Sequence, residues 1–285
     1  RNIGLLNPES GPTAGDSMQI SYEPILADMV AAARAAGALT QRHFAHFREL
    51  EIGIKGPADF VSDADRESEL LIRKFLFDRY PDWSFTGEEF PSVEAADQEF
   101  RWLVDPIDGT TNFVNGMHYT ISIALRRGNQ TVAGALYNPV ADEMFTAIKG
   151  GGAFLNGARL TVSPQANVGL FAIGTGLPVS NLHSFDGYYQ RLQTIRDPIG
   201  CVRVVGSSAN SCAYVACGRL TGYFEESGLI DWAVGVLLVQ EAGGIVTDWW
   251  GRGPELYEKS GMVIVANKAT HGWLVEQLRD APRKD

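Results

Sequence analysis

The chain has 285 residues, of which 45% are hydrophobic and 20% are charged, and its formal net charge is −10 at pH 7. This composition is ordinary for a globular protein, and the acidic balance argues against a general binder of nucleic acids or anionic membranes. Cys201, Cys212 and Cys217 follow neither a disulfide nor a zinc spacing, which indicates reduced thiols. With no long apolar run and no signal-peptide pattern, we expect a soluble, cytoplasmic protein.

The chain divides into a short tail and one folded domain. Residues 1–17 contain Gly, Pro and Ser without periodicity, and we expect a disordered tail there. Residues 18–285 are predicted to form a single domain, with an N-terminal part at 18–160 and a C-terminal part at 161–285.

Two helices are predicted early in the domain. Apolar residues recur at three- and four-residue steps over 22–47, with an alanine-rich run that favours a helix. A short strand at 52–55 follows. The next helix is expected to begin at Ser62 or Asp63, because a capping side chain and acidic residues favour a helix start. A strand at 83–85 then leads into the sequence GEE.

The middle of the chain has the pattern of an antiparallel sheet. Segments 119–126 and 131–137 are rich in β-formers and are separated by a hairpin signal, and 143–148 is a third strand. The glycine triplet at 150–152 lacks the Lys-Ser/Thr of a phosphate-binding loop, so we predict that it is a turn.

Strands and helices alternate in the second half, which predicts a second layered unit. The predicted strands are 171–175, 202–205, 220–225, 245–247 and 263–265. The predicted helices are 184–195, 207–217, 232–242 and 270–278.

The most informative stretch is 102–113, WLVDPIDGTTNF. A buried strand is predicted to deliver Asp105 and Asp108 onto a turn that the proline and the following glycine impose, and Thr110 and Thr111 suit a helix N-terminus. Two neighbouring carboxylates repel each other unless a hard cation lies between them. Carboxylates beside backbone N–H donors can therefore hold divalent cations and a phosphate together.

Other acidic residues have ordinary structural explanations when they are considered one at a time. Asp63 and Asp65 suit the first turn of a helix, Glu88 and Glu89 suit a solvated turn, and Asp231 suits a helix N-cap. Local sequence alone leaves these alternatives open.

Taken together, these segments resemble the inositol monophosphatase family, a superfamily of Mg²⁺-dependent, lithium-sensitive phosphatases that includes fructose-1,6-bisphosphatases and 3′-phosphoadenosine phosphatases. DPIDGTTNF is similar to the first family motif, 55–65 to the family stretch KxxxDxVTxxD, and GEE to a third signature. DWAVG with EAGG is similar to the second motif, WDxAxG followed by EAGG, although Ile230 stands where the motif tryptophan usually precedes the aspartate.

The resemblance implies an α+β fold, a layered α-β-α-β-α sandwich of the inositol monophosphatase and fructose-1,6-bisphosphatase type. It also implies two or three Mg²⁺ ions per site and a water molecule that attacks phosphorus in line. The implied metal ligands are Glu88, Asp105, the carbonyl of Ile107, Asp108 and Asp231. The implied catalytic residues are Asp65, Thr110 and Glu88, and Glu89 would support them. The implied phosphate- and substrate-binding residues are Asp108, Gly109, Thr110, Thr111 and Glu225.

By this resemblance we expect hydrolysis of a small polyol or sugar phosphate, inositol-1-phosphate first, in a homodimer. The stretch from Glu225 to Asp231 is one residue short against inositol-preferring members, so histidinol phosphate, fructose-1,6-bisphosphate and NADP stay open as substrates. Two other readings are a haloacid-dehalogenase-type phosphatase, whose two acids lie two residues apart rather than three, and a non-catalytic, metal-binding regulatory protein. A third alternative keeps the enzyme and adds a separate role with a partner.

Overall fold

The structure is a computed structural model. It describes five segments of the chain, which are residues 20–49, 52–56, 59–96, 98–177 and 185–279. The predicted tail at 1–17 lies outside the described residues.

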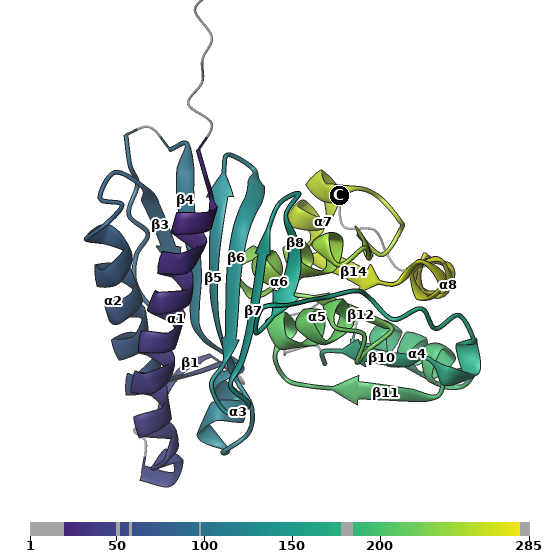
Figure 1. Cartoon of the computed structure of the whole chain (residues 1–285). Coiled ribbons are helices and arrows are strands. Elements are labelled where there is room, and N and C mark those ends of the chain that lie inside the picture. Colours follow the sequence, from purple (N-terminus) through teal and green to yellow (C-terminus); the bar gives the residue numbers. More distant parts are fainter. Residues whose placement is uncertain (1–19, 50–51, 57–58, 97, 178–184, 280–285) are drawn as a thin grey trace, which may run out of the picture.

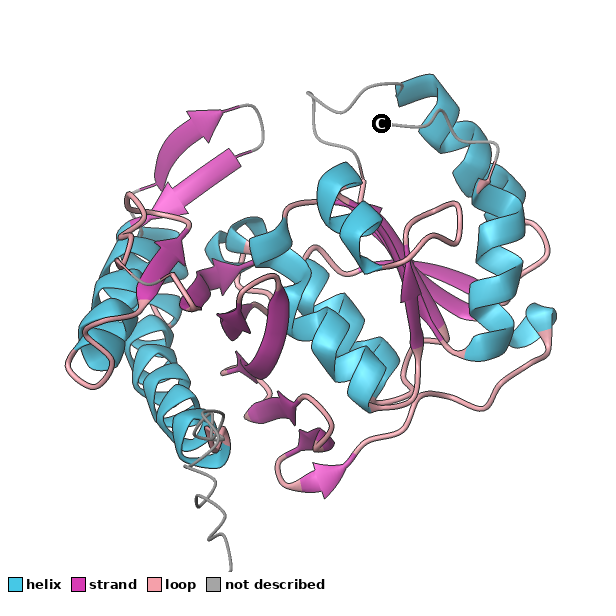
Figure 2. Cartoon of the chain, turned by 90° about the horizontal axis from the view of Figure 1, so that it is seen from above, coloured by secondary structure: helices cyan, strands magenta, loops and turns pink. Residues whose placement is uncertain are grey.

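Helices and sheets alternate in five layers (Figures 1 and 2). α1 (Glu23–Phe44) and α2 (Asp63–Phe77) cover the outer face of the first sheet. α5 (Ser208–Ala216) and α6 (Leu229–Glu241) lie between the two sheets. The outer face of the second sheet is covered by α4 (Phe185–Arg196) and α8 (Lys268–Leu278). The predicted α-β-α-β-α sandwich is confirmed.

The first sheet has seven strands in the order β3-β4-β5-β6-β7-β8-β9. All neighbouring strands are antiparallel except β3, which runs parallel to β4. Because both faces of this sheet are covered by helices, β4, β5 and β6 are buried along most of their length. Its strands are β3 (Ser84–Gly87), β4 (Phe100–Asp108), β5 (Thr120–Arg127), β6 (Gln130–Asn138), β7 (Glu143–Ile148), β8 (Gly152–Leu155) and β9 (Ala158–Arg159).

The second sheet is mixed and has the strand order β11-β10-β12-β14-β13. β10 is parallel to β11 and β12, whereas β14 is antiparallel to both of its neighbours. Its strands are β10 (Ala172–Thr175), β11 (Cys201–Val204), β12 (Gly222–Glu226), β13 (Ile245–Thr247) and β14 (Met262–Ala266).

Several local predictions were wrong. The helix predicted over 22–47 ends at Phe44, and a separate 3₁₀ turn follows at Phe47–Glu49. β2 (Asp59–Ser62), which pairs with β1 (Ile52–Gly56), and α7 (Pro254–Ser260) were not predicted at all. These elements are short, so their sequences carry too few periodic positions to reveal them.

Gly150 and Gly151 lie in a structural turn, as predicted, whereas Gly152 is the first residue of β8. The backbone N–H groups of Gly150 and Gly152 each donate to the carboxylate of Glu241 at 2.8 Å. Glu241 is the last residue of α6, whose residues from Trp232 to Val239 are buried because sheets lie on both of its sides. Glu241 thus joins the second motif to the first sheet.

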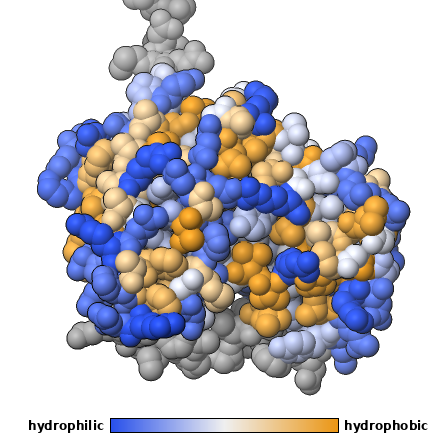
Figure 3. Space-filling view, turned by 60° about the horizontal axis from the view of Figure 1, so that its bottom comes forward, coloured by the Kyte–Doolittle hydropathy of each residue, from blue (hydrophilic) through white to orange (hydrophobic). Residues whose placement is uncertain are grey.

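No helix among the described residues is long and apolar enough to cross a bilayer. On the face that Figure 3 turns toward the viewer, hydrophobic residues are interspersed with hydrophilic ones.

Candidate active site

The first motif lies at the end of β4, where the chain leaves the sheet. Asp105 and Asp108 are 3% and 7% exposed, and the pairing of β4 with β5 is irregular between them. Gly109 then has a φ of +95°, and a Cβ there would lie 2.9 Å from the carbonyl oxygen of Gly206. A glycine is therefore required both for the turn and for the close approach of the second half. α3 (Thr110–Val114) begins at the next residue, as predicted.

Asp105 lies among other acidic side chains. Its Oδ1 accepts the N–H of Ile107 at 3.0 Å. Burial, followed by the negative charges of Glu88, Asp108, Asp231 and Asp65, raises the pKa of Asp105 well above its ordinary value. The charges of four acids that lie far apart in the sequence, between residues 65 and 231, therefore act on one buried carboxylate.

Asp65 serves two purposes. Its Oδ2 accepts the N–H and the hydroxyl of Ser62 at 2.8 and 2.6 Å, which makes it part of the capping box of α2. Its Oδ1 lies 3.1 Å from Oγ1 of Thr110, which is itself 3.2 Å from the carbonyl oxygen of Ile107. Burial raises the pKa of Asp65. Asp65 is therefore both a helix-capping residue, as its local sequence suggests, and a neighbour of Thr110, as the resemblance implies. Asp63, by contrast, is exposed.

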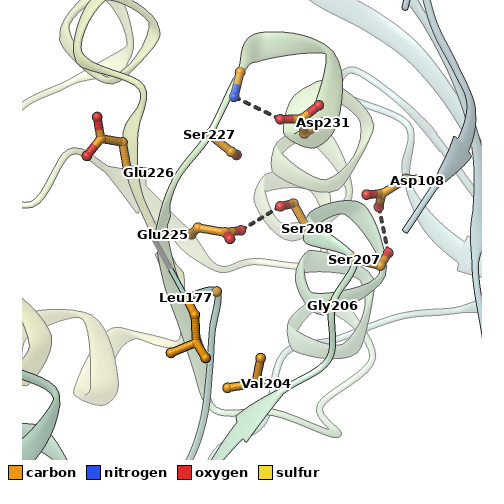
Figure 4. Close-up of a pocket in the computed structure, with 12 residues that line it drawn as sticks. Asp108, Leu177, Val204, Gly206, Ser207, Ser208, Glu225, Glu226, Ser227 and Asp231 are labelled. Carbon is orange, nitrogen blue, oxygen red and sulfur yellow. Dashed lines mark hydrogen bonds between the residues drawn. The ribbon is translucent and has the colours of Figure 1, made fainter. Parts of the chain in front are cut away.

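Asp108 connects the two halves of the chain (Figure 4). Its Oδ2 accepts hydrogen bonds from the hydroxyl of Ser207 at 2.5 Å, the N–H of Ala209 at 2.9 Å and the hydroxyl of Thr120 at 3.3 Å. Ser207 is also the N-cap of α5, since its hydroxyl oxygen accepts the N–H of Asn210. Burial raises the pKa of Asp108 to about 7 even though these bonds favour the charged form.

Asp231 does not open its helix as predicted. α6 begins two residues earlier, at Leu229, and Asp231 accepts the N–H of the N-cap residue Gly228 at 2.8 Å (Figure 4). Burial raises the pKa of Asp231. Asp65 and Asp231 thus hold the same position, the third residue of a helix, and each faces the site.

Glu225 lies on the other side of the site, at the end of β12. Its carboxylate accepts the hydroxyl of Ser208 at 2.5 Å and also that of Tyr223. Burial raises its pKa to about 8. A Cβ on Gly176 would lie 1.4 Å from Oε1 of Glu225, so a glycine is needed where the carboxylate packs. Glu226 points away from Glu225 and Asp231 in Figure 4.

A cavity of about 610 Å³ lies between these groups. Asp108, Glu225 and Asp231 line it together with the Gly206 turn. Leu177 and Val204, which are 46% and 53% exposed, form an apolar part of its wall (Figure 4). The cavity is thus acidic on one side and apolar on another.

The remaining predicted residues lie around the first motif. Glu88 follows β3 and is exposed, and its charge acts on Asp105. Gly109 and Thr110 are half-buried, and Thr111 is exposed. Within the part of the chain that the structure describes, no group of three His, Cys, Asp or Glu side chains has an arrangement that could hold a metal ion.

The chemistry of the donors nevertheless fits a hard divalent cation. Every side chain that converges on Asp105 is a carboxylate, and oxygen ligands are what Mg²⁺ and Ca²⁺ prefer. In each of Asp105, Asp108 and Asp231, one carboxylate oxygen accepts a hydrogen bond from a backbone N–H. Their mutual repulsion in a buried site is a cost that a cation relieves.

Sequence reasoning missed the residues that hold the second side of the site, which are Ser207, Ser208, Tyr223, Leu177 and Val204. One signal was available for the first two. Gly206-Ser207-Ser208 repeats the pattern of Gly109-Thr110-Thr111, a glycine followed by two hydroxyl residues at a helix start. The apolar residues have no comparable signature.

Comparisons with known proteins identify the family of the chain. The family model "Inositol monophosphatase family" matches residues 21–283. The inositol-1-monophosphatase of Rhizobium meliloti is 40% identical over 242 residues, which cover 84% of this chain and 90% of the relative. The Nus factor SuhB of Escherichia coli K12 is 36% identical over 260 residues, which cover 90% and 96%.

A solved structure shows the same fold. The crystal structure of the extragenic suppressor protein suhB from Bartonella henselae superposes with a TM-score of 0.87 at 36% identity, covering 91% of this chain and 100% of that one. The family match spans nearly all of the described residues, including every acidic residue of the site. The chain belongs to the inositol monophosphatase family.

Proposed function

We propose that this protein hydrolyses a small phosphate monoester, inositol-1-phosphate first, in a reaction that depends on Mg²⁺. The observation that supports this most directly is the convergence of Glu88, Asp65, Asp108 and Asp231 on the buried Asp105, beside a cavity of about 610 Å³. A cluster of buried carboxylates is costly unless cations bind to it.

The proposed ligands are carboxylates of Glu88, Asp105, Asp108 and Asp231 and the carbonyl of Ile107, for two or three Mg²⁺ ions. When bound, Mg²⁺ would neutralise these charges, polarise the phosphate and lower the pKa of a water molecule. Because the carboxylates of Asp105 and Asp231 already accept backbone N–H groups, their orientation is set before a cation arrives.

The reaction itself would use the pair Asp65 and Thr110. With the Thr110 hydroxyl 3.1 Å from the Asp65 carboxylate, the two groups can orient a water molecule, and Asp65 can accept a proton through the hydroxyl. Backbone N–H groups of Gly109, Thr110 and Thr111, at the start of α3, would bind the phosphate oxygens. No phosphorylated enzyme intermediate is required, which separates this mechanism from the haloacid-dehalogenase type.

The substrate alcohol would lie between Glu225 and the apolar wall. Glu225, held by Ser208, can accept hydrogen bonds from substrate hydroxyls, while Leu177 and Val204 can contact its C–H groups. The relative from Rhizobium meliloti is named inositol-1-monophosphatase, which favours that substrate. Histidinol phosphate, fructose-1,6-bisphosphate and NADP are the alternatives on the same site.

Phosphate release from a panel of these four monoesters and 3′-phosphoadenosine 5′-phosphate, with and without Mg²⁺, tests the proposal. We expect Mg²⁺-dependent release that is lost in Asp105→Asn, with the best substrate identifying the branch. A folded protein that binds Mg²⁺ and releases phosphate from none of them would favour the second candidate, a non-catalytic regulatory role. The name Nus factor SuhB of the Escherichia coli relative is the observation behind that candidate.

We further propose a cytoplasmic homodimer that lithium inhibits, since these are properties of the family. Sedimentation at several protein concentrations and lithium titration of the activity would test the two points separately.

A further inference from the structure

A buried carboxylate on α2 has no place in the mechanism above. Glu69 is fully buried, at 0% exposure, and lies one helical turn after Asp65. Residues four apart share one face of a helix, so Glu69 and Asp65 both face the first sheet. A carboxylate is rarely buried completely unless its oxygens are bound, so its contacts indicate its purpose.

The Glu69 carboxylate binds the turn that carries Glu88. Its Oε2 accepts the backbone N–H of Glu89 at 2.6 Å. No described residue donates a hydrogen bond to its Oε1, which lies 3.6 Å from a guanidinium nitrogen of Arg73, one further turn along α2. The carboxylate therefore ties the residue after Glu88 to the helix that carries Asp65.

Gly87 makes room for this contact. A Cβ at Gly87 would lie 2.2 Å from Oε1 and 2.3 Å from the carboxyl carbon of Glu69. Any other residue at this position would displace the carboxylate, because Glu69 is enclosed on all sides. The glycine of the sequence GEE is thus explained by its contact with Glu69.

Arg73 holds the far end of the same turn. It donates to the carbonyl oxygen of Pro91 at 2.8 Å, and its guanidinium carbon lies 4.7 Å from the ring centroid of Phe85 and 5.9 Å from that of Phe90. Two successive turns of α2 therefore hold the segment from 87 to 91, by the close packing of Glu69 at Gly87 and by bonds to Glu89 and Pro91. Glu88 lies between the packed glycine and the first bond.

We propose that Glu69 is a positioning residue, which holds the 87–91 turn so that Glu88 faces Asp105. One rigid helix then places two parts of the site at once: Asp65 directly, and Glu88 through the Glu69 carboxylate. The contacts alone support the conclusion that Glu69 holds the turn. The effect of Glu69 on metal binding rests on the proposed function.

The test compares Glu69→Gln with a matched control elsewhere in the fold. Asp248 is equally buried, accepts the backbone N–H groups of Trp250 and Arg252 at 2.9 and 2.8 Å, and pairs with Arg252 four residues later. Asp248→Asn therefore removes the same kind of carboxylate contact in the second half of the chain, away from the acidic cluster.

Two readouts separate positioning from stability. Hydrogen exchange of the Glu89 amide in the metal-free protein should become about 10-fold faster in Glu69→Gln and stay unchanged in Asp248→Asn. Calorimetric titration with Mg²⁺ should show about 10- to 100-fold weaker binding in Glu69→Gln alone, the usual effect of losing a group that orients a metal ligand. The KM for substrate at saturating Mg²⁺ should not change.

Wild-type exchange and Mg²⁺ affinity in Glu69→Gln would overturn the proposal, whatever its melting temperature. If Glu69→Gln fails to fold, Gly87→Ala displaces the same carboxylate from the turn side and should give the same two effects. Exchange and calorimetry need no turnover, so a wild-type protein without phosphatase activity would contradict the proposed function and leave this test intact.

Discussion

The two sides of the site are held by different mixtures of bonds. On the first side, most supporting bonds are local in sequence: Asp65 binds Ser62, and Asp105 and Thr110 both bind Ile107, while the bond between Thr110 and Asp65 spans 45 residues. On the second side, Glu225 binds Tyr223 two residues away and Ser208 17 residues away. Asp108 joins the sides through donors about 100 residues along the chain.

This difference explains why the first side has strong sequence motifs. Where a carboxylate and its donor lie within a few residues of each other, a turn or a helix start brings them together before the domain is complete. On the second side, the bonds from Ser207 to Asp108 and from Ser208 to Glu225 form only when α5, β12 and the first sheet pack together. We therefore expect changes on the first side to affect chemistry, and changes on the second side to affect substrate choice.

The largest effect is expected from Asp105→Asn. Loss of a central metal carboxylate should lower kcat/KM on the order of 10³-fold. Because burial and four neighbouring acids already disfavour the charged form of Asp105, the metal-free variant should melt at a higher temperature than wild type and gain less from Mg²⁺. Phosphate release and thermal denaturation measure the two effects.

Asp63→Asn is the control for this change, since Asp63 is an exposed acid near the same site. Activity of Asp105→Asn within tenfold of wild type would contradict the assignment of Asp105.

A smaller effect is expected where the two sides meet, in Ser207→Ala. This change removes the hydroxyl that donates to Asp108 at 2.5 Å and also the N-cap of α5. Mg²⁺ affinity should fall about 10- to 100-fold, and the free energy of unfolding by about 1 kcal/mol. Ser211→Ala is a matched control, because that buried hydroxyl bonds to the carbonyl of Ser207. Equal Mg²⁺ affinities in both variants would show that the hydroxyl does not support Asp108.

Gly176→Ala should affect the second side alone. The added methyl group would displace the Glu225 carboxylate, since its Cβ position lies 1.4 Å from Oε1. We expect KM to rise about tenfold and the ranking of substrates to change, with Mg²⁺ activation as in wild type. Gly169→Ala, where a Cβ would meet Asn167 at 3.5 Å, is the control. An unchanged ranking of substrates would show that Glu225 does not determine substrate specificity.

The last prediction concerns the pH dependence of stability rather than activity or metal affinity. Folding raises the pKa of Asp108 from 3.8 to about 7, so the folded state binds its proton more tightly than the unfolded state. Its contribution to stability is then fully present below about pH 4 and is lost as the pH rises through about 7. In metal-free samples, the melting temperature of wild type minus that of Asp108→Asn should decrease as the pH rises from about 4 through about 7. A difference that rises with pH would contradict the sign of the shift.

Much of the fold could be predicted because its signals are local. Periodic apolar positions identified α1, a capping signal identified the start of α2, and the hairpin signal near Gly128 identified the β5–β6 pair. The turn at Gly109 and the cap at Ser62 are also local, since each depends on the conformation or the hydrogen bonds of neighbouring residues. The roles of the acidic residues came from resemblance to the family, because each acid alone also suits a cap or a turn.

Other features depend on packing. The short elements β2 and α7 have too few residues for a periodic signal. Asp231 suits a helix N-cap, which predicts a helix start there, but α6 begins at Leu229 with Gly228 as its N-cap. The sequence around the exposed Leu177 and Val204 does not indicate that these residues line a cavity.

The sequence by itself therefore determined the α+β class, the buried strand ends and the two acids three residues apart on a glycine turn. Only the tertiary structure decided that Asp108 meets Ser207, that Glu225 packs on Gly176, and that Glu69 reaches the turn after β3. The physical reason is that bonds within a helix start or a turn follow from neighbouring residues. Bonds between layers depend on how the sheets and helices pack, which no short segment specifies.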